Sequence, residues 1–418
     1  MAETRRSDIL TTGYSKTTEM AAKGGAMRVA LLMNFIAPYR VKLLEALRDR
    51  VDELRVFIST PMESDRAWDV DWGTLNVTVQ RNLTVRRPYR DEFGFSRQLQ
   101  IHVPYDTLPQ LSRYAPNMVI SGELGARSIQ AATWRALHPK SSLLIWGTLS
   151  EHSERGWGKL RQLTRRAILR RADGALVNGE SGARYIHSFG MPDQRIFRVN
   201  QPVDVTLFTS KPRQRPDASM SRLLHVGSLT GRKGLTGFSS ALAEWGRRNP
   251  ARSLEVWWLG DGEQRAELEA ASLPSNISQR FLGNVPYAAL PDFYADADIL
   301  FFPTLLDEWG LVVNEAMAAG LPVLGSIYSQ AVEELVQDGE NGWVFDPLTE
   351  TSTLAALDRV FATPPERMAV MREAARRRVV ALTPAAAGER MVCAVRQVAD
   401  RASPAAWREG MARTGPKS

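Results

Sequence analysis

The sequence predicts an α/β protein of two doubly wound, Rossmann-like domains that face each other across a central cleft. Short apolar runs alternate with amphipathic helical patterns in two passes along the 418 residues. Such near-continuous apolar strands are typical of parallel sheets that helices cover on both faces. A chain of this length also exceeds one typical core. Because ligands bind such sheets at the carboxyl ends of the strands, we expect functional residues in the loops that follow.

The first domain is predicted over residues 27–210, after a polar stretch over 1–26 that we expect to be a disordered tail. Residues 211–221 are polar and contain proline, which is typical of a linker. The patterns predict helices over 39–50 and 180–188, and strands over 28–33, 54–59, 117–121, 142–146 and 174–178.

The second domain is predicted over residues 222–383. Residues 384–401 form a further helical pattern, which by analogy with this type of fold would cross back to the first domain, and 402–418 are expected to be a disordered tail. Apolar runs predict the strands of this domain over 222–226, 254–259, 280–282, 299–302, 322–324 and 342–345.

Composition narrows the class of protein. The 44% hydrophobic and 24% charged content is ordinary for a soluble globular protein, and no apolar run reaches the eighteen or so residues of a membrane span. The single cysteine, Cys393, excludes an internal disulfide and fits a reducing cytoplasm. The net charge of +7 fits nucleic acid, an anionic membrane surface or phosphorylated substrates. We expect no nucleic-acid partner, because the cations are not interleaved with aromatic residues on one surface.

A predicted strand-to-helix junction is the most informative segment. The run Ile299–Phe302 predicts a strand, and a helical pattern starts at Gly310 and stops at Gly320. The backbone N–H groups of Gly310, Leu311 and Val312 are therefore expected at the carboxyl end of a strand. Free N–H groups and the positive end of the helix dipole favour a phosphate group there.

Two acids flank this helix start. Glu315 lies just over one turn into the helix, and its side chain leans back toward the start. An acid beside phosphate-binding amides repels phosphate but suits neutral donors such as ribose hydroxyls. Asp307 precedes the turn and suits hydroxyls on the group beyond the phosphates. The local pattern therefore predicts a site for a nucleotide joined to a polyol.

A second loop, Gly227–Gly234, directly follows the predicted strand over 222–226. Its glycines let the backbone approach an anion, and its adjacent cations, Arg232 and Lys233, can neutralise a diphosphate. The charge that develops on a departing nucleoside diphosphate needs such cations. We therefore expect this loop to share one site with the junction at Gly310.

The segment from Asp307 to Pro322 resembles the nucleotide-sugar motif of family 4 glycosyltransferases, in which two glutamates with seven residues between them surround Phe/Trp-Gly-Leu-Val. Residues 309–312 and 315–318 fit this pattern. The resemblance implies a GT-B fold and a retaining, metal-independent transfer from a nucleotide-diphosphate sugar, without a further cofactor. It places Asp307 at the donor sugar and Glu315 at the ribose. Asp307 stands where glutamate is usual, unless Glu308 takes that role from one position later, and Trp309 belongs to the same motif.

The resemblance covers the rest of the second domain. Lys233 matches the lysine of the family's Gly-Arg-Leu…Lys-Gly element and Gly227 its first glycine, whereas Ser228 stands where arginine is usual. Arg232 is the candidate to replace that cation. The resemblance also places two strand-ending turns in the donor site, at Gly260 and at Asn284-Val285, with the second near the nucleobase.

The first domain offers fewer candidates. Arg40, at a predicted helix start, is a candidate contact for an acceptor phosphate and equally a solvated helix residue. Many relatives place a histidine near the donor sugar, at the turn that is Trp146–Thr148 here, and this chain has none there. His152 follows a few residues later, either reaching the cleft or lying on a surface loop.

The segment Arg155–Arg171 holds seven basic residues, with Trp157, Leu160, Leu163, Ala167 and Ile168 at helical spacing. Two interpretations stay open. The helix docks on an anionic membrane surface, or it covers the sheet with its apolar face and keeps its arginines in water.

Together these patterns predict a cytoplasmic glycosyltransferase of polysaccharide, glycan or glycolipid biosynthesis, with a peripheral position on the inner face of the membrane if the basic helix docks there. Its catalytic residues would be Asp307, Lys233 and Arg232, and its partners a nucleotide sugar and a glycan or lipid-linked acceptor. Two alternatives remain. A nucleotide-sugar epimerase would need a cluster of acid–base groups around the sugar, which we do not find. An inactive relative would fit Ser228, Asp307 and the missing histidine.

Overall fold

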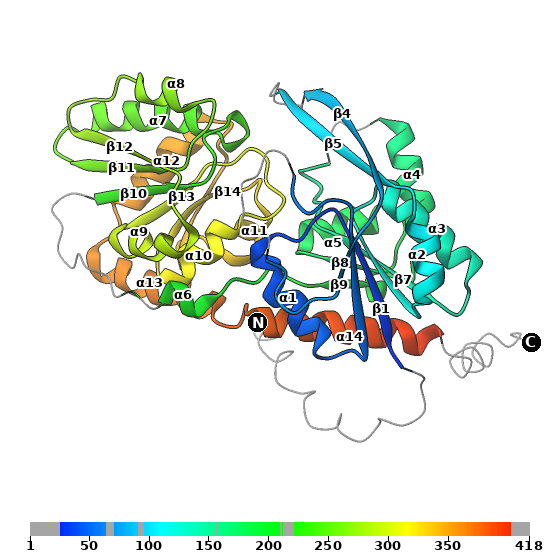
Figure 1. The fold of residues 1–418 in the computed structure, drawn as a ribbon. Helices are drawn as coiled ribbons and strands as arrows, with labels where there is room; N and C mark the ends of the chain where they lie inside the picture. Colours follow the sequence, from blue (N-terminus) through cyan, green and yellow to red (C-terminus); the bar gives the residue numbers. More distant parts are fainter. Residues whose placement is uncertain are drawn as a thin grey trace, which may run out of the picture.

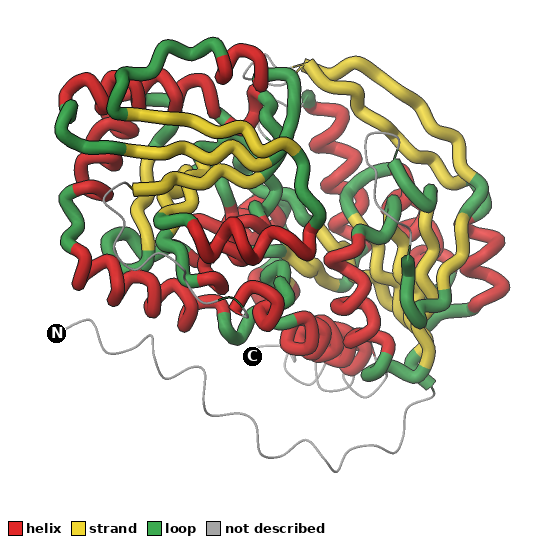
Figure 2. The backbone as a smooth tube through the Cα atoms, turned by 60° about the vertical axis from the view of Figure 1, so that its left-hand side comes forward, coloured by secondary structure: helices red, strands yellow, loops and turns green. Residues whose placement is uncertain are grey.

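The computed structural model describes residues 26–63, 71–90, 96–154, 158–209, 211 and 221–402. Two parallel sheets lie side by side, each covered by helices (Figures 1 and 2). The first has seven strands in the order β3-β2-β1-β6-β7-β8-β9, and the second has six in the order β12-β11-β10-β13-β14-β15. The prediction of two doubly wound domains is confirmed. The predicted tails, most of the predicted linker, Arg155 and Trp157 lie outside the described residues.

The first domain contains every strand that the sequence predicted for it and four that it did not: β3, β9 and the hairpin β4–β5. Its strands are β1 Arg28–Met33, β2 Glu53–Ile58, β3 Val77–Val79, β4 Asn82–Arg90, β5 Ser96–Pro104, β6 Met118–Gly122, β7 Ser142–Gly147, β8 Gly174–Val177 and β9 Ile196–Arg198. Its helices are α1 Pro38–Arg48, α2 Thr107–Tyr114, α3 Ala126–Leu137, α4 Lys159–Arg171, α5 Glu180–His187 and the short 3₁₀ turn η1 Asp193–Arg195.

The second domain follows the predicted strand order throughout. Its strands are β10 Ser221–Val226, β11 Leu254–Leu259, β12 Ile277–Gly283, β13 Ile299–Phe302, β14 Val323–Ser326 and β15 Gly342–Phe345. Its α-helices are α7 Leu235–Arg248, α8 Arg265–Glu269, α9 Leu290–Asp296, α10 Leu311–Ala319, α11 Gln330–Leu335, α12 Glu350–Phe361 and α13 Pro365–Val379, with 3₁₀ turns η2 Gly231–Lys233 and η3 Tyr287–Ala289.

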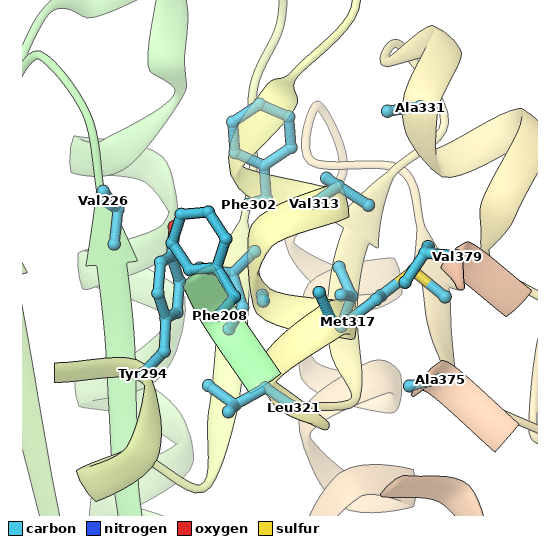
Figure 3. Packing of buried hydrophobic residues seen from close by; sticks show 14 of the residues in the cluster. Phe208, Val226, Tyr294, Phe302, Val313, Met317, Leu321, Ala331, Ala375 and Val379 are labelled. Carbon is cyan, nitrogen blue, oxygen red and sulfur yellow. The ribbon is translucent and has the colours of Figure 1, made fainter. Parts of the chain in front are cut away.

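The core of the second domain includes a segment that the sequence assigned to the first. Helix α6, Val205–Thr209, places the ring of Phe208 beside Tyr294, with the two ring centroids 5.6 Å apart (Figure 3). Val203 and Val205 are buried in the same cluster as Tyr294 and Met317. The core of the first domain therefore ends before Val203, earlier than the predicted boundary at residue 210.

The final helix, α14 Pro384–Ala402, lies along the lower edge of the first domain in Figure 1. Met391 and Val395 are buried in one cluster with Leu43 and Leu47 of α1. The two helices approach closely at Gly388, where a Cβ atom would lie 2.7 Å from the Cβ of Ala46. The contact joins the end of the chain to the first domain.

We predict that Gly388→Ala lowers the free energy of unfolding by about 1–3 kcal/mol, because the added methyl group forces α14 away from α1. Gly237→Ala is the matched control, since Gly237 is also in a helix but has no atom within 4 Å of an added Cβ. Alanine there is expected to be neutral or stabilising by about 1 kcal/mol. Denaturant unfolding of both variants checks the pair, and equal effects would contradict the close contact.

Candidate active site

The start of α10 lies at the carboxyl edge of the second sheet. Strand β13 ends at Phe302, and α10 begins at Leu311 after Gly310. Gly310 has a φ of 105°, and a Cβ there would lie 2.8 Å from the Phe302 ring, so both the backbone and the space require glycine. The first N–H groups of a helix have no acceptor within it. The junction thus presents the phosphate-binding geometry that the sequence predicts.

The structure brings the three predicted catalytic residues together. The Nζ atom of Lys233 donates to the carboxylate of Asp307, and Lys233 is only 7% exposed. Arg232 donates from Nη1 to the carbonyl oxygen of Leu306 at 3.2 Å, and its own carbonyl accepts from the N–H of Leu305 at 2.9 Å. The Gly227–Gly234 loop and the loop before α10 are therefore interlocked.

Burial and the neighbouring charges shift the pKa values of Lys233 and Asp307 in opposite directions. Burial lowers the pKa of Lys233, and the negative charge of Asp307 only partly offsets that effect. Burial also tends to raise the pKa of Asp307, but the charges of Lys233 and Arg232 outweigh it and hold that pKa below its ordinary value. Asp307 therefore carries its charge at neutral pH, and it compensates the buried ammonium group.

Glu315 is 5% exposed and points toward the predicted nucleobase turn. The hydroxyl of Tyr294 donates to its Oε2 atom at 2.8 Å, and Tyr287, which follows the Asn284-Val285 turn, also donates to it. Burial outweighs these hydrogen bonds and raises the pKa of Glu315 to about 7. The carboxyl group thus lies between α10 and that turn, as a ribose contact would require.

The other predicted donor-site loops meet at the same edge. Gly260 has a φ of 133°, and a Cβ there would lie 1.9 Å from the carbonyl oxygen of Gly227. The Gly260 N–H donates to the Gly283 carbonyl at 2.8 Å, next to Asn284. Ser228 is exposed in its loop.

Trp309 differs from the prediction. Its side chain is only 2% exposed, and its indole N–H donates to Asn314 Oδ1 at 2.8 Å. The indole therefore stabilises the start of α10 from within the core.

Asp307 and Glu308 point to different partners. Asp307 pairs with Lys233, whereas Glu308 accepts a hydrogen bond from Thr148 of the first domain at 3.3 Å. The geometry thus favours Asp307 as the acid beside the diphosphate site and gives Glu308 a place between the domains. The Glu308 side chain keeps an exposed surface. Even so, loss of water in the cleft, together with the charges of Glu123 and Asp307, raises its pKa to about 7 against the opposing charge of Arg40.

Glu123 was missed by the sequence reasoning. It follows β6 at the carboxyl edge of the first sheet, its side chain is exposed, and its φ is 65°, in the left-handed region that costs a non-glycine residue energy. Its backbone is fixed by hydrogen bonds to Trp146 and Ser128. Its place directly after the predicted strand over 117–121 was the available signal.

The two acceptor candidates both lie at the cleft. The half-buried Arg40 has its guanidinium 5.1 Å from the centre of the Trp146 ring and lies close enough to Glu308 to affect its pKa. The His152 side chain is 16% exposed, and its ring packs edge-on against Tyr328 of the second domain at 5.6 Å. His152 therefore does not lie on an open surface loop.

Helix α4 corrects part of the prediction for Arg155–Arg171. Arg165 is 2% exposed, pairs with Glu154 and donates to Tyr185, so it is not a solvated cation. Conversely, Leu160 and Leu163 are 79% and 63% exposed, although a covering helix would turn them toward the sheet. No helix in the described part of the chain is long and apolar enough to cross a membrane.

Comparison with known proteins shows which family the second domain resembles. Residues 209–378 match the family model of glycosyl transferases group 1. The putative colanic acid biosynthesis glycosyltransferase WcaL of Salmonella typhimurium is 27% identical over 45% of this chain and 47% of its own length. Sucrose synthase of Thermosynechococcus vestitus is 33% identical over 37% of this chain and 20% of its own length. The D-inositol 3-phosphate glycosyltransferase of Corynebacterium efficiens is 29% identical over 47% of this chain and 51% of its own length. The chain thus spans about half or less of the length of these relatives.

Solved structures resemble the whole described architecture. The apo form of the lipopolysaccharide outer core galactosyltransferase WaaB has a TM-score of 0.66 at 15% identity, over 89% of this chain and 99% of that one. Anabaena HepE in complex with UDP has a TM-score of 0.65 at 16% identity, over 89% of this chain and 100% of the HepE chain. At these identities the likeness establishes the GT-B fold.

The raised pKa of Glu315 has a consequence for stability. An acid whose pKa rises from 4.5 unfolded to about 7 folded binds more protons in the folded state, so its contribution is complete below pH 4.5 and is lost as the pH rises to 7. We predict that the wild type loses roughly 3 kcal/mol through this group over that range, and that Glu315→Gln removes this part of the pH dependence. Denaturant unfolding at several pH values measures it. The exposed Glu340→Gln serves as the control, and a Glu315→Gln profile parallel to the wild type would contradict the burial argument.

Proposed function

We propose that this chain, whose residues 209–378 match the family model of glycosyl transferases group 1, moves a sugar from a nucleotide-diphosphate sugar to an acceptor hydroxyl with retention of configuration. The observation that carries the proposal is the meeting of Lys233, Asp307 and the α10 start at one edge of the second sheet. The diphosphate of a nucleotide sugar can contact Lys233 and the start of α10 there, and the hydroxyls of its sugar can contact Asp307. Polysaccharide or glycolipid biosynthesis is the proposed setting.

Each donor contact has a physical role. The N–H groups of the first turn of α10 donate hydrogen bonds to the diphosphate, and Lys233 with Arg232 neutralises the charge that grows as the diphosphate leaves. Glu315 holds the ribose hydroxyls. Asp307 orients the sugar so that the acceptor hydroxyl attacks from the face of the leaving group. These groups are largely fixed by the interlocked loops before the donor enters, which favours stabilisation of the transition state.

The acceptor is proposed to enter from the first-domain side of the cleft. Arg40, Glu123, Thr148 and His152 lie on that wall, and Glu308 faces them from the second domain. The pKa of Glu308 lies above its ordinary value, through desolvation in the cleft and the charges of Glu123 and Asp307. We assign this residue to the positioning of the acceptor hydroxyl.

We predict that loss of Lys233 lowers turnover about a hundred- to a thousandfold, the usual effect of removing one contact to transition-state charge. Lys233→Met alone leaves the half-buried Asp307 without its cation, which lowers stability as well as activity. The double variant Lys233→Met with Asp307→Asn removes both charges and is the cleaner test. Lys140→Met, at an exposed lysine, is the control. Near-normal transfer by the folded double variant would remove both residues from the mechanism.

The donor is identified by thermal shift against a panel of nucleotide sugars, since ligand at a hundred times its dissociation constant adds about 2.7 kcal/mol of stability. Product analysis then separates transfer from epimerisation of the donor. Binding without transfer or hydrolysis would favour the inactive-relative alternative.

We also propose that no metal ion serves the diphosphate, because Lys233 and Arg232 supply the positive charge. The expected result is transfer that is unchanged by EDTA and by added Mg²⁺ or Mn²⁺, measured with the donor that the panel identifies. Loss of transfer in EDTA, restored by a divalent cation, would contradict this assignment.

Peripheral contact with an anionic membrane is proposed through the outward face of α4. Leu160 and Leu163 are exposed there, with Lys159, Arg166 and Arg170 on the adjoining turns. Such a face fits the boundary between lipid headgroups and acyl chains. A lipid-linked acceptor would then meet the cleft at the bilayer surface.

A further inference from the structure

A basic hollow lies at the far end of α4 from the candidate active site. Its volume is about 380 Å³, and its polar lining comes from Arg135 of α3, Arg170 and Arg171 of α4, Asp173, and Arg195 of η1. Asp173 immediately precedes β8, and Arg195 immediately precedes β9. The hollow therefore lies at the amino edge of the first sheet, whereas the cleft lies at the carboxyl edge.

The single carboxylate of the hollow is already satisfied. Arg135 binds Asp173 through two nitrogens at 2.8 and 3.1 Å, and the N–H of Leu143 donates to the same carboxylate at 2.8 Å. Arg195 donates to the backbone carbonyl of Asp173 at 2.8 Å and to that of Ala172. Two guanidinium groups are thus held in fixed positions.

Arg170 and Arg171 complete the hollow. Both are exposed, and no ion pair of either is found within the described ranges. Four arginines against one carboxylate leave a local charge of about +3, and guanidinium groups suit the oxygens of phosphate because they donate in pairs. The arrangement of two fixed and two unpaired arginines indicates an anion site.

The hollow is continuous with the exposed face of α4. Arg170 lies seven residues, about two turns, after the exposed Leu163, so both occupy the same side of the helix. On the opposite side, Arg161 and Arg165 pair with Glu154. The arginines of α4 that face the protein therefore share the carboxylate of Glu154, whereas Arg170 and Arg171 have no ion pair with any described residue. This complementarity favours an anionic lipid surface as the occupant.

We propose that the hollow formed by Arg135, Arg170, Arg171 and Arg195 binds the phosphate group of an anionic phospholipid, while Leu160 and Leu163 enter the lipid interface. This inference rests on the membrane contact proposed above and names its binding site. It also sets the orientation of the protein. With the hollow anchored, α4 lies along the bilayer, and its first turn, which follows β7, brings the cleft side of the first domain to the surface.

The test is co-sedimentation of the full chain with vesicles of phosphatidylcholine, with and without phosphatidylglycerol. Arg170→Gln with Arg171→Gln is expected to weaken binding to the anionic vesicles by more than the roughly thirtyfold that diffuse attraction of two surface cations gives, at about 1 kcal/mol for each cation. Lys159→Gln with Arg166→Gln removes the same charge from the same helix without touching the hollow, and a clearly smaller loss is expected. Circular dichroism confirms that both variants fold.

A second measurement distinguishes a specific phosphate site from diffuse electrostatic attraction to the membrane. Inorganic phosphate, at an ionic strength held constant with sodium chloride, is expected to displace the wild type from anionic vesicles more strongly than chloride alone. Equal losses in the two double variants, or displacement that depends on ionic strength only, would overturn the phosphate site. Absence of vesicle binding by the wild type would overturn the membrane contact. Neither outcome affects the thermal-shift measurement with nucleotide sugars, which tests the proposed glycosyl transfer separately.

Discussion

The ion pair between the buried Lys233 and the half-buried Asp307 is the interaction on which the candidate site of the second domain depends. It joins two loops whose residues are 74 positions apart in the chain. The ammonium group of Lys233 could not be buried without a partner at an acceptable cost, because an unpaired buried charge is strongly destabilising. The pair therefore makes the two loops fold as one unit. Gly234 shows how tight the junction is, since a Cβ there would lie 2.2 Å from the carbonyl oxygen of Pro303.

This unit also determines where the neighbouring acids point. With Asp307 held by Lys233, the next side chain, Glu308, is directed across the cleft toward Thr148. Gln330 of α11 supports the same crossing, because its amide donates to the carbonyl oxygens of Thr148 at 3.1 Å and Glu308 at 2.5 Å. Nearby, Arg184 of α5 pairs with Glu333 of α11 at 2.8 Å. The cleft is therefore a composite of both domains, and its charge pattern exists only when they are in contact.

Several elements lay beyond sequence reasoning for identifiable reasons. The hairpin strand β4 carries the charged sequence NLTVRRPYR and pairs only with β5, so it has no apolar run to predict it. The edge strands β3 and β9 have three residues each, too few for a periodic pattern. In α4 the spacing predicted an amphipathic helix but not which side packs inward. Arg165 is buried because Glu154 and Tyr185 meet it there.

The sequence by itself determined the strand order of the second domain, the helix start at Gly310 and the glycine-rich loop around Lys233. These features are local, because strand and helix patterns, glycine conformations and helix ends depend on neighbouring residues. Only the tertiary structure decided that Asp307 rather than Glu308 meets Lys233, that Glu123 adopts a left-handed backbone at the cleft, and that α4 exposes its leucines. Burial and charge pairing depend on residues far apart in the chain, so no local pattern could specify them.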